Sequence, residues 1–185
     1  MQKIIALAAL AAFTALAGCS TAPPPAVVAV RPPPPPVVLT ASAQADRAAT
    51  AKFGAKPLKA GDYLWSPAAV PAGEAKVVVS LSRQLAWVYQ GDEIIGVATV
   101  SSGKKGHESP WGIFPVMEKR KVHRSNRYSN APMPFMHRLN KWGVALHGGA
   151  IPGYPASHGC IRLPIKFAEK LFGVTKVGTS VIVDA

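Results

Sequence analysis

A thiol, two histidines, several glycines and an arginine lie close together near the C-terminal end of the sequence. His147 follows a short apolar stretch, and the segment Ser157-His158-Gly159-Cys160-Ile161-Arg162 comes after a brief loop rich in glycine and proline. A cysteine attacks carbonyl carbon as a thiolate, so it needs a base, and backbone N–H groups must hold the oxyanion that forms. The segment contains the parts that nucleophilic catalysis by Cys160 requires. The alternative is a buried cysteine that packs like a small apolar side chain.

The first nineteen residues predict export and a lipid anchor. Lys3 precedes an apolar run from Ile4 to Leu16, which is typical of a signal peptide and short for a membrane span. The run ends in Leu16-Ala17-Gly18-Cys19, which resembles a bacterial lipobox. We therefore expect cleavage of residues 1–18 and lipidation of Cys19, with an ordinary secretory signal as the alternative. Ser20 after the cysteine favours the outer membrane, with the domain facing the periplasm.

The cysteine count and the charge fit an exported protein. The chain has two cysteines, so lipidation of Cys19 leaves Cys160 without a partner for an internal disulfide. The formal net charge of +12 indicates an anionic neighbour. Because an exported domain does not normally meet nucleic acid, we expect cell-wall polymers or lipid headgroups and no nucleic acid.

Composition divides the rest of the chain. Residues 19–40 form a linker in which Pro32 to Pro36 enforce polyproline II. Residues 41–74 are interpreted as an adaptor whose alanine-rich start predicts a short helix at 41–51. Residues 75–185 form the predicted catalytic domain.

That domain is predicted to be mainly β. Strands are expected at 76–81, 85–89 and 94–100, the last two joined in a hairpin at Gln90-Gly91-Asp92, and further strands at 111–116, 143–147 and 180–183. Pro115 places the fourth of these at an edge or a bulge. One clear helix is expected at 164–172, with Gly173 ending it.

The block S-H-G-C-I-R-L, preceded by H-G at a strand end, resembles the catalytic signature of the L,D-transpeptidase (YkuD-like) family. Weaker matches follow in the same order along residues 75–184: V-V-V-S-L-S-R-Q-L-A-W-V-Y, the S-S-G loop, S-P-W-G-I-F and V-G-T-S-V-I-V. The resemblance implies a compact β-sandwich whose one clear helix follows the catalytic loop. It also implies attack on a peptidoglycan stem peptide at the bond before D-Ala, a cysteine thioester, and reaction with carbapenems.

The resemblance also implies roles for individual residues. Cys160 would be the nucleophile and His147 the proton donor and acceptor. Gly159, together with Cys160, would offer backbone N–H groups to the oxyanion. His158 would orient the loop.

Three further residues are expected near the substrate. Arg162 would bind a stem-peptide carboxylate or brace the loop, and Ser157 would contact substrate or hold the loop. Tyr154 would line the pocket or serve as a turn aromatic. The loop 149–156 is shorter than in many family members, so the pocket wall is expected to differ.

No cofactor is implied, and no metal is expected, because His107, His123 and His137 lack ligand spacing. The basic segment 119–141 is interpreted as a solvated loop, a contact to anionic glycan, or part of a lid.

Three functions stay open. An amine of a second stem or of an envelope protein could take the acyl group, water could take it in a hydrolase, or the chain could be a tether without turnover.

Overall fold

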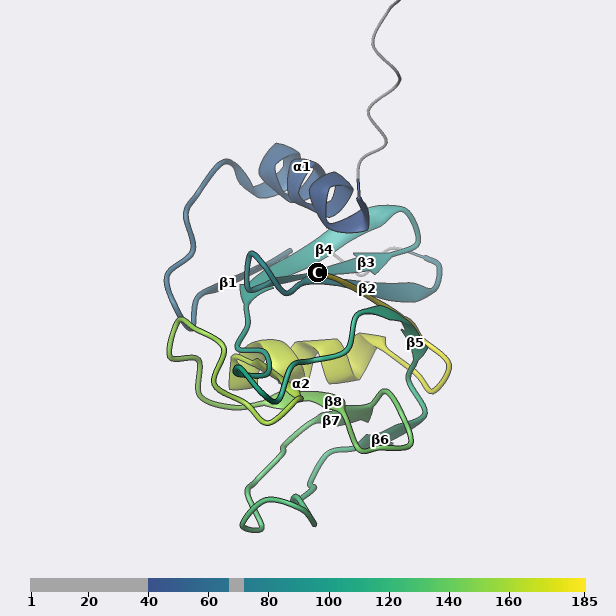
Figure 1. Cartoon of the computed structure of the whole chain (residues 1–185). Coiled ribbons are helices and arrows are strands. Elements are labelled where there is room, and N and C mark those ends of the chain that lie inside the picture. The colour runs from purple at the N-terminus through teal and green to yellow at the C-terminus, as the bar shows by residue number, and fades with distance from the viewer. Residues whose placement is uncertain (1–39, 67–71) are drawn as a thin grey trace, which may run out of the picture. The chain divides into compact units, whose positions relative to one another are not determined.

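Two β-sheets and two helices make up residues 40–66 and 72–185, the part of the chain that this computed structural model describes (Figure 1). In chain order the elements are α1 (Ala41–Phe53), β1 (Tyr63–Trp65), β2 (Ala75–Ser80), β3 (Leu85–Gln90), β4 (Glu93–Thr99), β5 (Gly112–Pro115), β6 (Glu118–Arg120), β7 (Met136–Arg138), β8 (Ala145–Gly148), β9 (Ile161–Leu163), α2 (Ile165–Val174) and β10 (Ser180–Asp184). The mainly β class is confirmed. The predicted signal peptide, Cys19 and the linker as far as residue 39 lie outside the described residues.

The larger sheet has six strands in the order β1-β4-β3-β2-β10-β5. β2, β3 and β4 form an antiparallel meander, and β10 joins it parallel to β2. The predicted hairpin is confirmed, since β3 and β4 are connected at Gly91, which has a positive φ. Pro115 lies on β5 at the edge of this sheet, as its missing N–H requires.

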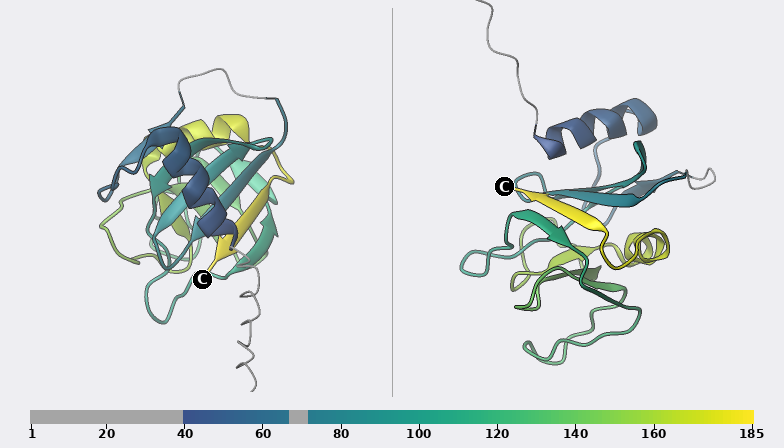
Figure 2. Two further views of the ribbon diagram at one scale, coloured as in Figure 1. Left: turned by 90° about the horizontal axis from the view of Figure 1, so that it is seen from above. Right: turned by 90° about the vertical axis from the view of Figure 1, so that its right-hand side faces the viewer.

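Two elements within residues 41–66 pack onto this sheet. α1 begins after Thr40, whose hydroxyl accepts the Ala43 N–H at 3.2 Å. Ala45 and Ala49 on α1 are buried in one cluster with Trp87 of β3, and β1 pairs with β4. Within the segment that we expected as an adaptor, α1 therefore covers one face of the large sheet (Figure 2), and β1 adds a strand at its edge.

α2 lies between the two sheets. Its buried side chains Phe167, Ala168 and Leu171 belong to one core cluster with residues of both sheets. The helix predicted at 164–172 is confirmed within two residues, although Gly173 lies inside its last turn. Within residues 40–66 and 72–185, neither helix is long and apolar enough to cross a bilayer.

The smaller sheet, in the order β6-β7-β8-β9, holds the site residues. Two of its strands, β6 and β7, come from the basic segment that the sequence predicted to be irregular. They pair through Lys119 opposite His137. β9 was also not predicted. It begins directly after Cys160 and runs parallel to β8, so this sheet fixes the distance between the two parts of the sequence motif.

Candidate active site

The parallel pair β8 and β9 places Cys160 and His147 on one face of the smaller sheet. Leu146 lies opposite Ile161, and His147 lies opposite Arg162. Leu146 and Ile161 are buried in the central core. Because side chains alternate along a strand, His147 and Arg162 point to the other face, where Cys160 also packs.

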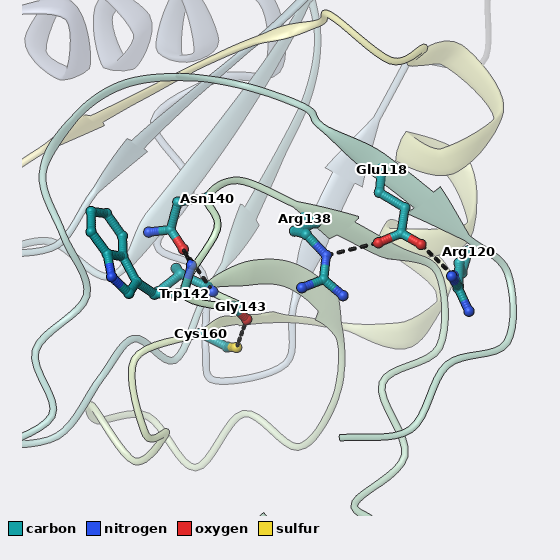
Figure 3. A network of polar contacts seen from close by, with 8 residues as sticks. Glu118, Arg120, Arg138, Asn140, Trp142, Gly143 and Cys160 are labelled. Carbon is teal, nitrogen blue, oxygen red and sulfur yellow. Dashed lines mark hydrogen bonds and ion pairs between the residues drawn. The ribbon is translucent and has the colours of Figure 1, made fainter. Parts of the chain in front are cut away.

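The thiol of Cys160 lies against a tight turn formed by residues 140–144. Its Sγ donates to the Gly143 carbonyl, with 3.7 Å between sulfur and oxygen (Figure 3). The buried Asn140 side chain shapes this turn, because its Oδ1 accepts the N–H groups of Trp142 and Val144, both at 3.1 Å. The carbonyl is therefore held in place by contacts within segment 140–144.

Electrostatics keep the thiol and the imidazole neutral at rest. Burial raises the pKa of Cys160, and the Ala145 N–H and the Arg162 cation offset this only in part. Burial lowers the pKa of His147, which is 7% exposed, and Arg162 lowers it further. His147 Nδ1 lies 2.9 Å from the Gly148 carbonyl. Since a carbonyl only accepts, Nδ1 bears the proton and Nε2 keeps a lone pair that can take a proton.

Ser157 and Gly159 give the nucleophile loop its shape. Ser157 Oγ accepts the Gly159 N–H at 3.1 Å and donates to the Cys160 carbonyl. Gly159 has a φ of 113°, a positive value that glycine adopts readily and residues with a side chain rarely adopt. The Gly159 N–H that we expected at the oxyanion is thus already bonded within the loop, and Ser157, which is 2% exposed, uses its hydroxyl for the same purpose.

Sequence reasoning missed a serine that holds this loop from the side. Ser109 Oγ donates to the Gly159 carbonyl at 2.9 Å and accepts the Gly103 N–H at 2.9 Å. Gly103 must be glycine, because a Cβ there would lie 1.9 Å from the His107 carbonyl oxygen. Gly103 belongs to the S-S-G motif and Ser109 to the S-P-W motif, but no local pattern indicates that these motifs contact the nucleophile loop.

Gln84 is a second contributor that sequence reasoning missed. It has a φ of 53°, unusual for a residue with a side chain. Its Nε2 donates to Leu81 O at 2.6 Å and to Ser102 Oγ at 2.7 Å, and its Oε1 accepts the Ser102 N–H at 3.0 Å. The Ser102 carbonyl in turn accepts the N–H groups of Ala156 and Ser157, each at 3.0 Å. Gln84 is therefore linked by hydrogen bonds to the start of the nucleophile loop.

Cys160 lines two cavities of different chemistry. The larger, about 470 Å³, contains His147 and Arg162 among mostly apolar residues such as Met133 and Ile165. The smaller, about 170 Å³, is lined by the basic side chains Arg127 and Arg138 together with His123, Trp142 and the carboxylate of Glu108. Cys160 thus borders two cavities, and His147 lines the larger one.

The wall shared by these cavities is aromatic. His158 and Tyr128 line both, and their rings stack with centroids 4.6 Å apart. The rings of His158 and His107 also pack edge to face, with their centroids 4.8 Å apart. His158 therefore connects three loops beside Cys160, consistent with an orienting role.

The other predicted substrate contacts lie at different distances from the site. Arg162 lines the larger cavity and donates to the Ala156 carbonyl at 3.3 Å, so it both faces the cavity and braces the loop. Tyr154 lines neither cavity at Cys160. Its ring is 61% exposed on a surface turn, and its carbonyl accepts from Ser101 Oγ at 2.8 Å. The structure therefore does not bring Tyr154 to the pocket.

The three histidines outside the motif have different surroundings. His107 and His123 both line the smaller cavity, where His107 contacts His158, and His137 is buried against Thr175. In the part of the chain that the structure describes, no three histidine, cysteine or acidic side chains gather into a metal-binding group.

A sequence profile of the L,D-transpeptidase catalytic domain matches residues 74–183, more than half of the chain. The chain belongs to the L,D-transpeptidase catalytic-domain family. This segment contains both cavity walls, the nucleophile loop and Gln84. The L,D-transpeptidase family acts on peptidoglycan stem peptides.

Solved L,D-transpeptidases have a similar fold. One from Stackebrandtia nassauensis is 27% identical, with a TM-score of 0.56 over 64% of this chain and 59% of that one. One from Mycobacterium tuberculosis H37Rv is 22% identical, with a TM-score of 0.57 over 60% and 57%. L,D-transpeptidase 3 from M. tuberculosis, in complex with a faropenem-derived adduct, is 21% identical, with a TM-score of 0.55 over 60% of each chain.

These matches span about 60% of the length of the solved chains. A comparison with curated proteins found no match.

Proposed function

We propose that this chain is a peptidoglycan L,D-transpeptidase that works through a thioester at Cys160. The observation that supports the proposal most strongly is the position of Cys160 between two cavities, one of which contains His147 with a free Nε2 lone pair. A transferase needs room for both an acyl donor and an acceptor at one sulfur atom. A tether without turnover has no need of either arrangement.

In the first half-reaction, the Cys160 thiol and the His147 imidazole both start in their neutral forms. The Cys160 thiol passes its proton to His147 Nε2, and the sulfur attacks the carbonyl carbon that precedes D-Ala in the stem. The Cys160 N–H is the backbone donor that we assign to the oxyanion. As the C–N bond breaks, the imidazolium of His147 returns the proton to the departing D-Ala amine, and the thioester remains.

The second half-reaction uses the same histidine in reverse. The acceptor amine gives a proton to His147 Nε2 and attacks the thioester carbonyl, and the thiolate of Cys160 then recovers that proton. The leaving amine and the acceptor amine both exchange a proton with His147. Both therefore occupy the larger cavity, and the acyl part of the donor stem occupies the smaller one.

The acceptor that we propose is an amine of a second stem or of an envelope protein. The domain would act in the periplasm, attached to the outer membrane through a lipidated Cys19. Replacing Cys19 with alanine is expected to release the protein into soluble fractions, and continued sedimentation with membranes would reject the anchor.

The faropenem-derived adduct of the M. tuberculosis enzyme supports a further proposal, that faropenem acylates Cys160 here.

The test uses the fragment Val37–Ala185, which keeps Thr40 and the whole compact unit. This fragment and its Cys160→Ala variant are incubated with purified disaccharide-tetrapeptide, and the products are read by mass spectrometry. We expect a crosslinked dimer that has lost one D-Ala, absent with the variant. Tripeptide alone would replace transpeptidation with hydrolysis. An unchanged substrate with both proteins, also in the presence of an added amine acceptor, would refute the proposed reaction.

A further inference from the structure

The stretch that encloses the site has an extreme charge balance. From residue 119 to residue 168 the sequence contains nine lysines and arginines and no aspartate or glutamate. They are Lys119, Arg120, Lys121, Arg124, Arg127, Arg138, Lys141, Arg162 and Lys166. Both walls of the cavities at Cys160 draw residues from this stretch. An anionic ligand is therefore attracted to the site entrance.

Part of this charge is used inside the fold. Lys119 turns inward, where its Nζ donates to Phe172 O at 2.8 Å and to Thr175 O and lies 4.2 Å from the centre of the Phe172 ring. Lys119 thus caps carbonyl groups at the C-terminal end of α2. Arg120 and Arg138 share the carboxylate of Glu118 (Figure 3). Lys119, Arg120 and Arg138 therefore have partners within the fold and do not present free charge to a glycan.

A different group of cations is exposed and unpaired. Arg127 and Lys141 both contact Trp142, which is 64% exposed. Arg127 Nη1 donates to Trp142 O at 2.9 Å, and Lys141 Nζ lies 5.0 Å from the centre of its ring. Among the described residues, neither cation forms an ion pair with a carboxylate. We name Arg127, Lys141 and Trp142 the cationic rim.

The cationic rim is continuous with the smaller cavity. Arg127 and Trp142 both line that cavity together with Cys160. Arg127 is held by its bond to the Trp142 carbonyl, a neutral acceptor, so its charge is positioned but not neutralised. The exposed indole of Trp142 adds apolar ring surface next to these two positive charges, which suits a ligand with ring faces as well as anionic groups.

We propose that the cationic rim binds carboxylates of the peptidoglycan strand whose stem acylates Cys160, with Trp142 against the strand beside them. The inference rests on the proposed function, because it takes the polymer to be peptidoglycan. That polymer has free carboxylates in its stems, within reach of the bond that is cut. The rim would hold the donor strand so that its acyl segment enters the smaller cavity.

The experiment measures binding without turnover. Full-length protein with Cys160→Ala is sedimented with purified sacculi over a range of salt concentrations, with and without the added pair Arg127→Gln and Lys141→Gln. A matched control replaces Lys56 and Lys59, exposed on the segment between α1 and β1, with glutamine. We expect the rim pair to weaken binding about five- to tenfold at low salt, and the control pair less than twofold. Circular dichroism checks that each variant is folded.

Two further binding substrates, amidated sacculi and lipid vesicles, identify which anionic group the cationic rim binds. Sacculi whose carboxylates have been amidated are expected to lose the rim-dependent part of binding. Unchanged binding to them would overturn the inference, as would rim-dependent binding to phosphatidylglycerol vesicles that equals binding to sacculi. Trp142→Ala is expected to weaken binding to native sacculi several-fold, even at high salt.

Failure of the rim and failure of the proposed function give different results. If the rim variants bind sacculi like the parent while the unmodified enzyme forms crosslinks, the rim inference is wrong and the function stands. If binding depends on the rim but the unmodified enzyme forms no product, the proposed reaction is wrong and the surface stands.

Discussion

Replacing Gln84 with alanine tests whether contacts remote from the sulfur position the nucleophile. The change removes both donations from Gln84 Nε2 and leaves the Ser102 N–H without its acceptor. Ser102 is 4% exposed, and its carbonyl holds the N–H groups of Ala156 and Ser157. We therefore expect the nucleophile loop to lose its anchor on the large sheet.

The expected loss of stability can be worked from these bonds. An orphaned buried N–H costs about 1–3 kcal/mol, and each neutral hydrogen bond contributes about 0.5–1.5 kcal/mol net. Leu81 O and Ser102 Oγ regain water in part, because Gln84 borders a cavity below α1. The free energy of unfolding is then expected to fall by about 3 kcal/mol, which lowers Tm by roughly 10 °C.

A second variant separates stability from positioning. Gln84 has a positive φ, which costs a residue with a Cβ about 1–2 kcal/mol and glycine nothing. Gln84→Gly is therefore expected to be more stable than Gln84→Ala by up to about 1 kcal/mol, after the greater chain entropy of glycine is counted. Both variants lack the amide, so both are expected to slow acylation of Cys160 about 10- to 100-fold.

Intact-mass spectrometry measures the rate of acylation by faropenem at a temperature where all variants are folded. Wild-type rates in both variants would refute a positioning role for Gln84. Recovery of the rate in Gln84→Gly alone would assign the effect to backbone strain and not to the amide. Gln84→Glu keeps the acceptor for Ser102 N–H and is expected to fall between alanine and wild type.

Three other predictions concern single residues. Because burial raises the pKa of Cys160, its alkylation by iodoacetamide is expected to rise with pH to a midpoint above that of a free thiol, and fast labelling at pH 6 would contradict the neutral resting pair. Gly159→Ala is expected to remove acylation, since its φ of 113° is unfavourable for alanine; an unaffected faropenem rate would show that the loop tolerates another conformation. Burial lowers the pKa of His137 to about 4, so the unfolded chain binds the proton first and stability falls as pH drops from about 6.5 toward 4. Chemical denaturation at both pH values should show a loss of stability that is smaller by about 3 kcal/mol in His137→Gln, while the loss that comes from the lowered pKa of His147 is common to both proteins.

Local patterns in the sequence were sufficient for much of the fold. The β-branched run of β2, the Gly91 turn and the apolar spacing of α2 are each short-range signals, and the structure confirms all three. β6, β7 and β9 were not predicted, because they are only three residues long and basic or polar residues interrupt them. Such strands are stabilised by their partners in the sheet and not by their own propensity.

By itself, the sequence determined which residue types the site contains. A cysteine with histidines, glycines and an arginine at fixed spacing favours thioester chemistry through residue identity, which does not depend on folding. Only the tertiary structure decided which groups are free to act. It showed that the Gly159 N–H is bonded to Ser157, that Lys119 caps the C-terminal end of α2, and that Tyr154 lines neither cavity at Cys160. Hydrogen-bond partners and burial depend on segments far apart in the chain, such as Gln84 and Ser102, and no local pattern encodes which of them meet.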